Sequence, residues 1–337
     1  MVREKPKSSK QLLVSDDGLE EITLQTRILE ESNLPELIKT GGIKTIWQID
    51  RLVDNSLANP ATEKYINSVI VSSHSIGVWD NKELSAFIIG SIPQWDIDFF
   101  GYNSYVVRHV WYDSKKSLDR LLEYFEEQMK NWDIKYAYAK FPTAEKPTTR
   151  MFEEIGFTLA DLRVTFNKKL VNEKPFPTNI GDLVFELAKN EDMEPIANLS
   201  KEVSKQDRFH SDPNVDSELA DELYYQWIIN GFSKGKDTVK CLVDGELAGF
   251  HMSYPEKSIE DKGIYPLSIS DIMGVYPRFG GRGIGTGLFV NYFGLAQSRG
   301  QRSVIAGVHI DNVISLRLHE GVGFKAVHTE IGLRKWY

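Results

Sequence analysis

Cysteine is almost absent from this sequence. Its 337 residues include one cysteine, Cys241, so no disulfide can form within the chain and no metal site can depend on cysteine ligands. Cys241 falls in an apolar, strand-like stretch, where a small buried hydrophobic residue is a more common outcome than a nucleophile. We therefore expect no metal cofactor and no cysteine chemistry.

Long apolar runs and an excess of positive charge are also missing. No stretch approaches the ~18 apolar residues that a membrane helix needs, and the opening residues, MVREKPKSSKQ, have no apolar signal-peptide core. The 40 Lys and Arg residues against 48 Asp and Glu give a net charge of −8, which argues against nucleic acid or an anionic membrane as the partner. We expect a cytoplasmic protein, either a monomer or a homodimer.

What the chain does contain is enough apolar and aromatic material for two ordinary domains. Hydrophobic residues make up 41% of the chain, and its length is that of a two-domain protein. The stretch VNEKPFPTNIGD, residues 171–182, holds two prolines and a glycine between two periodic segments. We predict a flexible polar tail at 1–20, a first domain at 21–172, a linker at 173–182 and a second domain at 183–337.

The two halves repeat one another. MFEEIGF at 151–157 matches LHEGVGF at 318–324, an offset of 167, and each follows a helix-like run and then a strand-like run. In the second half we predict a strand at 267–275, a helix to about 299, a strand at 302–309, a short helix at 312–320 and two final strands. Strands mixed with helices in this order predict a duplicated domain of the α/β (α+β) class.

A glycine-rich loop lies between a predicted strand and a predicted helix. Five of the eight residues from Gly280 to Gly287 are glycine, and each costs roughly 0.5–1 kcal/mol of conformational entropy relative to alanine. Such a loop can bring the backbone N–H groups of a helix start close to a phosphate. The spacing excludes a Walker loop, which needs Gly-Lys-Ser/Thr, and a dinucleotide loop, since Leu288 takes the place of the last glycine.

The loop resembles the acetyl-CoA loop of the GNAT N-acetyltransferase superfamily. Val275-Tyr276-Pro277 precedes it, and Gly280 stands where the family usually has Arg or Gln. A second family pattern is met by Asn312, Ser315, His319 and Gly323-Phe324, with His319 in place of the usual tyrosine. The resemblance implies two tandem GNAT-like domains, each a mixed, mostly antiparallel central sheet flanked by helices, and acetyl-CoA as cosubstrate. The cofactor-binding residues that it implies are Met273, Gly274, Val275, Gly280, Gly281, Arg282, Gly283, Ile284, Gly285, Thr286, Asn312 and Ser315.

Shorter segments are similar to bacterial nucleotide-sugar N-acetyltransferases that act on dTDP-4-amino-4,6-dideoxygalactose (dTDP-fucosamine). They are WDIDFFG at 95–101, Asp207-Arg208-Phe209, and YYQWI at 224–228. This similarity implies a small-molecule amine, a nucleotide-linked amino sugar, as the acceptor. Two alternatives remain open: acyl transfer to another small amine or a peptide, and a non-catalytic acyl-CoA sensor.

Two residues are candidates for proton transfer. His319, at the position of the family's usual acid, either protonates the leaving thiolate or accepts the amine's proton, and a nearby helix C-terminus favours its charged form. Asp271 is either the base for the amine or an ordinary strand carboxylate. Backbone N–H groups around Gly274 and Val275 are the candidate donors to the carbonyl oxygen.

Five further residues are candidates for substrate binding. Arg208 and His210 lie in a polar loop where a diphosphate would need cations. His251 and His309 are strand histidines that are either buried and hydrogen-bonded or line the cleft. The complete set is Arg208, His210, Trp227, His251 and His309.

The first half lacks the residues that carry this chemistry. At the offset of 167 the loop corresponds to DSKKSLDR, residues 113–120, which contains no glycine, and His319 corresponds to Phe152. We therefore expect the first domain to be a degenerate copy that shapes the structure and the substrate site.

Overall fold

The computed structural model describes residues 24–43, 45, 52, 54–70 and 74–337. The tail predicted at 1–20 lies outside these described residues. Backbone contacts divide the chain into two compact units. Unit 1 takes its described residues from 1–49, 59–159 and 331–337, and unit 2 from 50–58 and 160–330.

Unit 1 is built on a mixed sheet whose strands run in the order β1 (Leu24–Ile28), β2 (Ile76–Asp80), β3 (Glu83–Ser91), β4 (Asn103–Tyr112), β5 (Ile134–Pro142) and then the end of β12 (Lys325–Trp336). From β1 to β4 the neighbours are antiparallel, and β4–β5 is parallel. Its helices are α1 (Leu34–Thr40), most of α3 (Asn55–Ile70), α4 (Gln94–Phe100), α5 (Lys115–Asn131) and α6 (Lys146–Glu154). Apolar residues of α5 recur at helical spacing, and Leu121, Phe125 and Met129 bury that face against the sheet.

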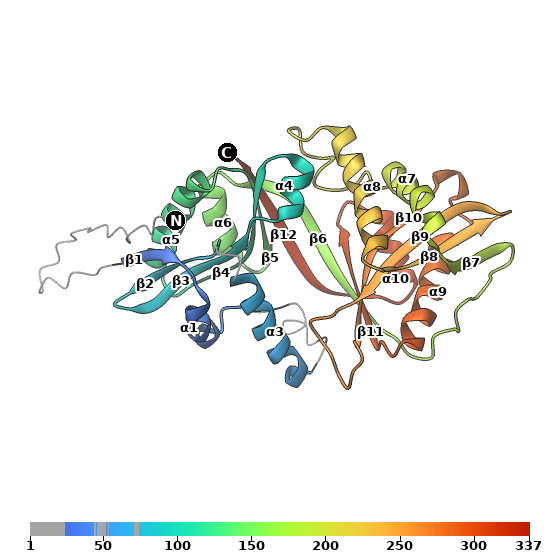
Figure 1. The fold of residues 1–337 in the computed structure, drawn as a ribbon, viewed down its shortest axis with the longest axis horizontal. Coiled ribbons are helices and arrows are strands. Elements are labelled where there is room, and N and C mark those ends of the chain that lie inside the picture. Colours follow the sequence, from blue (N-terminus) through green and yellow to red (C-terminus); the bar gives the residue numbers. More distant parts are fainter. Residues whose placement is uncertain (1–23, 44, 46–51, 53, 71–73) are drawn as a thin grey trace, which may run out of the picture. The chain divides into compact units, whose positions relative to one another are not determined.

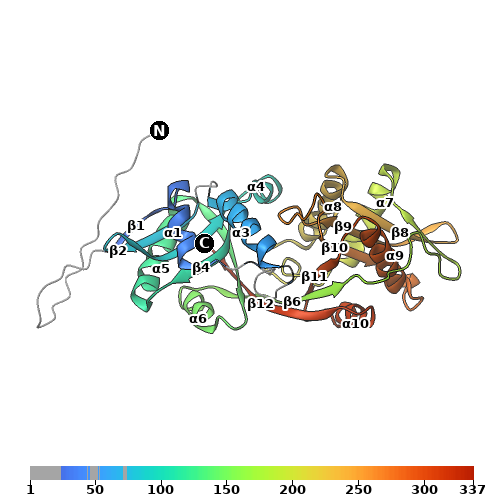
Figure 2. The same cartoon turned by 90° about the horizontal axis from the view of Figure 1, so that it is seen from below.

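Unit 2 has a second mixed sheet, with its strands in the order β12, β6 (Thr158–Lys169), β11 (Ser303–His309), β10 (Leu267–Val275), β9 (Glu246–Pro255), β8 (Asp237–Val243) and β7 (Leu183–Leu187). The β10–β11 pair is parallel, and the pairs from β10 to β7 and β6–β11 are antiparallel. The helices are α7 (Met193–Val203), α8 (Ser217–Ser233), α9 (Ile284–Ser298) and α10 (Val313–Gly321). Helices α7 and α8 cover one face of β8–β10, and α9 covers the other (Figures 1 and 2).

The duplication predicted from the sequence is confirmed in the elements themselves. Helix α6 and helix α10 have bounds that differ by 167 at both ends, and so do strands β6 and β12. Phe152 lies in a cluster with Phe125 and Phe157, and its counterpart His319 lies in a cluster with Phe289 and Phe324. The chain therefore has the predicted tandem arrangement of two α/β units with mostly antiparallel sheets.

The last strand of each half contributes to the other unit. Residues 160–169 of β6 belong to unit 2, where β6 pairs with β11 from Arg163–His309 to Lys169–Ser303. Residues 331–337 belong to unit 1, where the Tyr337 N–H donates to the Lys135 carbonyl at 2.9 Å. The sequence placed all of 21–172 in one domain and two separate strands after Phe324. The structure instead has one continuous strand there, β12. Its residues up to 330 belong to unit 2 and those from 331 belong to unit 1.

The segment predicted to be a linker is bound to α9. Residues 173–182 form no helix or strand, but the Thr178 N–H donates to the Asn291 side chain at 2.6 Å and the Glu173 N–H to that of Gln297 at 2.8 Å. Gly294 permits this approach, since a Cβ there would lie 1.9 Å from the Lys174 carbonyl oxygen. The linker thus packs against α9 without adding a regular element.

Candidate active site

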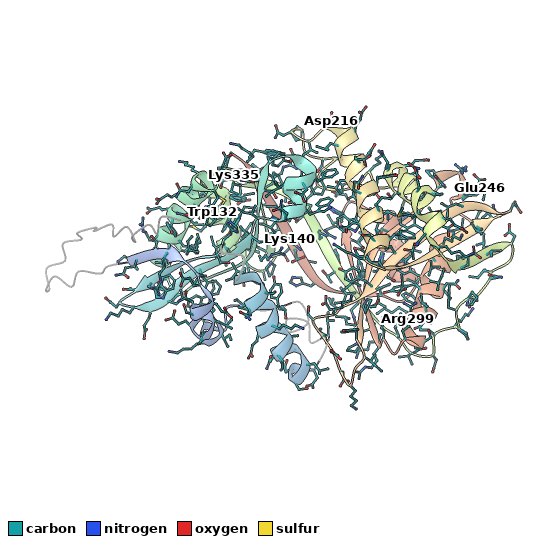
Figure 3. The ribbon with its side chains drawn as sticks, in the orientation of Figure 1. Trp132, Lys140, Asp216, Glu246, Arg299 and Lys335 are labelled. Carbon is teal, nitrogen blue, oxygen red and sulfur yellow. The ribbon has the colours of Figure 1, made fainter. Side chains whose placement is uncertain are left out.

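Helix α9 begins without a side-chain cap, whereas α8 and α10 of the same unit each have one. Asp216 caps α8, its carboxylate accepting from the Glu218 N–H at 2.8 Å (Figure 3). At α9 the capping residue is Gly283, in the left-handed region with φ 79°, and no side chain accepts from the first turn. Gly281 has φ 77°, so both positions need glycine for their backbone conformation.

The backbone N–H groups of residues 281–286 form no hydrogen bond within the described part of the chain. The first one that does is Gly287 N–H, which donates to the Gly283 carbonyl at 2.9 Å. A Cβ built on Gly281 or on Gly283 would meet no atom within 4 Å, so this side of the loop is open. Unpaired N–H groups at the positive end of a helix dipole, on an open surface, fit a bound phosphate.

Two other glycines of the loop serve packing. A Cβ on Gly285 would lie 2.9 Å from the Leu318 side chain, and one on Gly287 would lie 2.2 Å from the ring of Phe185. These glycines let α9 approach α10 and β7. The density of glycine in the sequence thus has two physical causes: an open backbone at Gly281 and Gly283, and close helix packing at Gly285 and Gly287.

Strands β10 and β11 separate next to this loop. Their parallel pairing runs only from Leu267–Ser303 to Ser270–Ala306, although β10 continues to Val275 and β11 to His309. The Tyr276 N–H donates to the Ala248 carbonyl on the β9 side. Since N–H directions alternate along an antiparallel ladder, the N–H of Gly274 also faces β9, and those of Met273 and Val275 face the separated β11 side.

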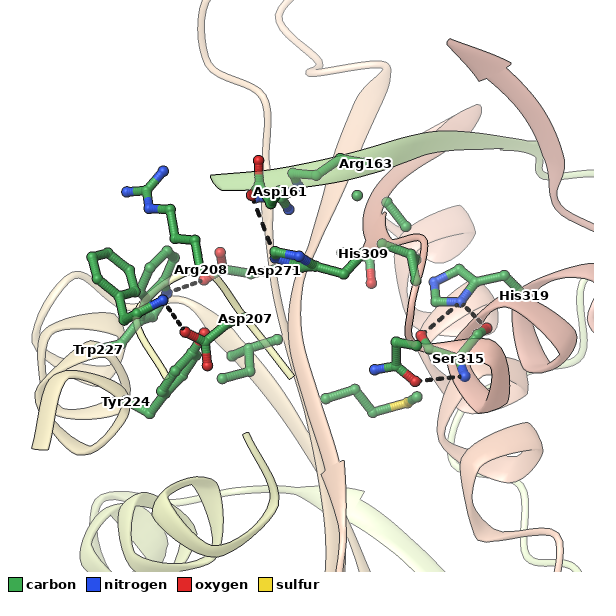
Figure 4. Close-up of a pocket in the computed structure, with 18 of the residues that line it drawn as sticks. Asp161, Arg163, Asp207, Arg208, Tyr224, Trp227, Asp271, His309, Ser315 and His319 are labelled. Atoms are coloured by element: carbon green, nitrogen blue, oxygen red, sulfur yellow. Dashed lines mark hydrogen bonds and ion pairs between the residues drawn. The ribbon is translucent and has the colours of Figure 1, made fainter. Parts of the chain in front are cut away.

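A cavity of about 310 Å³ lies within unit 2 where the two strands separate. It is lined from β6, β10, β11, α8, α9, α10 and the loop before α8 (Figure 4). Of the predicted cofactor residues, Met273, Asn312 and Ser315 line it, and Asn312 caps α10 by accepting from the Ser315 N–H at 3.0 Å. The residues from Gly280 to Thr286 are not among its lining residues.

His319 lines the cavity as a neutral imidazole. Its Nδ1 lies 2.7 Å from the carbonyl oxygen of Ser315 and must carry hydrogen to donate there, which leaves a lone pair on Nε2. Burial among Phe166, Phe289 and Phe324 lowers the pKa of His319 below its usual value, and the hydrogen bond to Ser315 opposes this only in part. The helix end was expected to favour the charged ring, but burial outweighs it.

Asp271 lies in the cavity wall with two donors on its carboxylate. Strand pairing shifts between Ser270 and Ile272, so Asp271 is the extra residue of a β-bulge. Lys236 Nζ donates to its Oδ2 at 2.6 Å and Trp227 Nε1 donates to the same oxygen at 3.1 Å. A carboxylate held by a cation and an indole N–H is better suited to positioning than to removing a proton.

Of the predicted substrate residues, Arg208, Trp227 and His309 line the cavity, whereas His210 and His251 do not. His210 is held behind the wall by Asp207 at 2.5 Å and Asp221 at 2.9 Å. His251 is fully buried in β9, with Nε2 2.8 Å from the Ser270 hydroxyl, and burial lowers its pKa to about 3. Both histidines therefore support residues that face the cavity.

Strand β6 brings two charged residues to the cavity that were not predicted from the sequence. Asp161 and Arg163 line it next to His309, and Asp207 lines it next to Arg208. A Cβ on Gly307 would lie 2.9 Å from Arg163 Nη2, so the guanidinium lies over β11. No local pattern marks Asp161 or Arg163, because β6 was assigned to the first domain. The lining has three carboxylates and two guanidinium groups, so it is neither basic nor acidic as a whole.

The counterpart of the loop in unit 1 is closed. At the start of α5 the Ser114 hydroxyl accepts from the Ser117 N–H at 3.2 Å, and the Asp113 carboxylate accepts from the Ser117 hydroxyl at 2.9 Å. Side chains thus cap the first turn, and a carboxylate stands where an anion would bind.

Among the described residues no group of three or more His, Cys, Asp or Glu is arranged to hold a metal ion. No helix in that part of the chain has the length and apolar character to cross a bilayer.

Comparison with known proteins agrees with this geometry. Residues 202–324 match the model of the GNAT acetyltransferase family. Over 286 residues the chain is 22% identical to the spore coat polysaccharide biosynthesis protein SpsD of Bacillus subtilis (strain 168). The aligned residues cover 81% of this chain and 93% of SpsD. Over 149 residues it is 27% identical to a phosphinothricin N-acetyltransferase of Streptomyces coelicolor, covering 42% of this chain and 82% of that protein.

The fold has a solved counterpart as well. A tandem GNAT protein from the clavulanic acid biosynthesis pathway superposes with a TM-score of 0.57 and 12% identity, covering 93% of this chain and 98% of that one. At this identity the likeness concerns the fold alone, and it extends over both units.

Proposed function

The chain is a GNAT-type N-acetyltransferase, and on that premise we propose that it transfers an acetyl group from acetyl-CoA to the primary amine of a nucleotide-activated amino sugar. The observation that carries the acetyl-CoA part is the row of unpaired N–H groups at residues 281–286. Two linked phosphates are an anion of the size and charge that such a row can hold. Acetyl-CoA, when bound, supplies an activated carbonyl and a thiol leaving group.

The protein groups that would serve the reaction surround the separated strands. We propose that the N–H groups of Met273 and Val275 donate to the carbonyl oxygen as negative charge develops on it, since they face the β11 side. Asn312 and Ser315 lie beside His319 on the cavity wall and would hold the chain that leads to the thioester. In the resting site the neutral His319 has to accept a proton before it can give one to sulfur.

The acceptor part rests on the mixed lining of the cavity. Arg163 and Arg208 present guanidinium groups, which suit phosphate oxygens, and Asp161 and Asp207 present carboxylates, which suit sugar hydroxyls. The volume of about 310 Å³ is at the lower end of the ~300–1,000 Å³ that small-molecule sites occupy, so we propose that the sugar enters it, the diphosphate reaches the two guanidinium groups and the nucleoside stays outside. SpsD is named for polysaccharide biosynthesis, which supports a sugar acceptor.

A second acceptor class is favoured by one observation. The phosphinothricin N-acetyltransferase relative is named for a small non-sugar amine, and three carboxylates in the cavity lining could bind an ammonium group without any nucleotide. Transfer to another small amine is therefore the alternative.

We further propose that unit 1 carries out no transfer, because side chains cap its α5 and Phe152 occupies the position equivalent to His319.

Thiol release from acetyl-CoA in the presence of an acceptor panel tests this proposal. The panel holds dTDP- and UDP-linked amino sugars, the matching free amino sugars, phosphinothricin and a short peptide. We expect kcat/KM for a nucleotide-linked amino sugar to exceed that of its free sugar by about 100-fold, because charge-assisted hydrogen bonds to the diphosphate contribute about 1.5–3 kcal/mol each. Equal rates with the free sugars, or a preference for phosphinothricin, would remove the nucleotide-sugar acceptor.

A further inference from the structure

We propose that His309 is the general base that takes the proton from the acceptor's ammonium group, with Asp161 as the residue that positions it. The inference rests on the proposed acetyl transfer, and it names the residue that makes the amine nucleophilic.

Strand pairing brings the two residues together. In the β6–β11 ladder His309 lies opposite Arg163, and Asp161, two residues before Arg163, shares its face as the diagonal neighbour of His309. His309 Nε2 lies 3.8 Å from Asp161 Oδ2, and both residues line the cavity (Figure 4). The carboxylate therefore faces one nitrogen of a ring that reaches the substrate space.

The other ring nitrogen is available for a proton. At 3.8 Å the Asp161 carboxylate attracts the ring without a hydrogen bond, and it favours the tautomer that carries hydrogen on Nε2. The lone pair then lies on Nδ1, and within the described residues Nδ1 forms no hydrogen bond. The charged groups that face the ring are Asp161 and Arg163 from β6 and Asp207 and Arg208 from the loop before α8. Burial and the two guanidinium groups lower the pKa of His309, against the two carboxylates, so the ring is neutral at neutral pH.

Three other titratable groups on the side of the cavity away from His319 are engaged or stay neutral (Figure 4). Asp271 accepts from Lys236 and Trp227. Asp207 accepts from the Phe209 N–H at 2.6 Å and lies 2.5 Å from the His210 ring. Burial raises the pKa of Tyr224, so it stays a neutral phenol. His309 is left with a carboxylate behind it and an unbonded nitrogen.

The step balances without any further reactant. One N–H bond of the ammonium breaks, its electron pair stays on nitrogen, and the proton forms a bond with Nδ1 of His309. The imidazolium is stabilised by the Asp161 carboxylate and returns its proton to water. The neutral amine then has the lone pair that attack on a carbonyl requires. After attack the same nitrogen loses a second proton, which Nε2 of the neutral His319 can accept and pass to the leaving sulfur.

Replacing His309 by glutamine should lower kcat about 100-fold at neutral pH, within the ~10²–10⁴ range of general base catalysis, and leave CoA affinity unchanged. The distinctive signature lies in the pH dependence. The ratio of wild-type to His309→Gln kcat should fall toward one as the pH rises through the pKa of the acceptor's amine, because solvent then removes the proton. A ratio that stays constant with pH, or an unchanged kcat, overturns the proposal.

In the plot of kcat against pH, kcat of the wild type should fall at low pH as His309 becomes protonated. Substitutions of Arg163 and Asp161, the charged neighbours of His309, should shift the midpoint of this fall in opposite directions. Arg163→Gln removes a cation that disfavours imidazolium, so the midpoint of kcat against pH should rise. Asp161→Asn removes an anion that favours imidazolium, so the midpoint should fall. Unchanged midpoints in both variants would mean that His309 does not govern this fall. His328→Gln in β12, away from the cavity lining, is the matched histidine control and should retain wild-type kcat.

The assays use whichever amine the wild-type protein acetylates in the panel. If that amine is not a nucleotide sugar, the proposed acceptor is wrong while His309 is still measured as the base. If the wild-type protein acetylates no amine, both proposals are refuted together.

Discussion

Replacing Gly281 and Gly283 together by alanine is expected to weaken CoA binding about 100-fold. Both residues have positive φ, which costs an L-residue about 1–2 kcal/mol per position. The loop should relax and turn its N–H groups away from the phosphates. Losing two charge-assisted hydrogen bonds, each worth about 1.5–3 kcal/mol, accounts for a factor of that size. Isothermal titration calorimetry with CoA measures it directly.

Gly235→Ala is the control for backbone strain in this experiment. Gly235 has φ 67°, a Cβ there would meet no atom within 4 Å, and it follows α8 rather than preceding α9. The variant should lose the stability of one such position, about 1–2 kcal/mol, and bind CoA like the wild type. If the loop variant also binds CoA normally, the N–H groups of residues 281–286 are not the phosphate site.

His319→Phe is expected to lower kcat by about 10²–10⁴-fold, the contribution of a positioned proton-transfer group, while CoA still binds. The fold should accept the substitution, since three phenylalanine rings already surround His319 and Phe152 occupies the equivalent position in unit 1. Steady-state thiol release gives kcat, and calorimetry gives CoA affinity.

The pH profile adds a check on His319. Because burial lowers its pKa, the wild-type ring should take up a proton only at a pH below the usual titration range of histidine. His319→Phe should therefore lose any dependence of kcat on that protonation. Retention of wild-type kcat in the variant would show that His319 takes no part in the chemistry.

The fold could be predicted because its signals are local or repeated. Gly-Phe at 156–157 and again at 323–324, with the same elements around both, marked the duplication. Glycine at 281 and 283 marked a backbone that other residues adopt poorly. The sequence of a strand does not determine which strand it pairs with, however. Strand β6 was therefore assigned to the first domain, whereas the structure pairs it with β11.

The site was harder to predict because its decisive contacts join distant residues. The sequence left open whether Asp271 is a base or an ordinary strand carboxylate, and only the structure shows Lys236, from before β8, 2.6 Å from its carboxylate. His210 looked like a ligand for phosphate, but Asp221 of α8 helps to hold it behind the cavity wall. Asp161 stands 148 positions before His309 in the chain, taking the difference of their numbers, and only the ladder brings them together.

The most direct test of the phosphate site is a titration of ¹⁵N-glycine-labelled protein with CoA, followed by NMR. The amide resonances of Gly281, Gly283 and Gly285 should move as CoA is added, and those of Gly41 and Gly101, which end helices in unit 1, should not. If saturating CoA leaves the three loop resonances where they were, the helix start does not bind the coenzyme and the account fails.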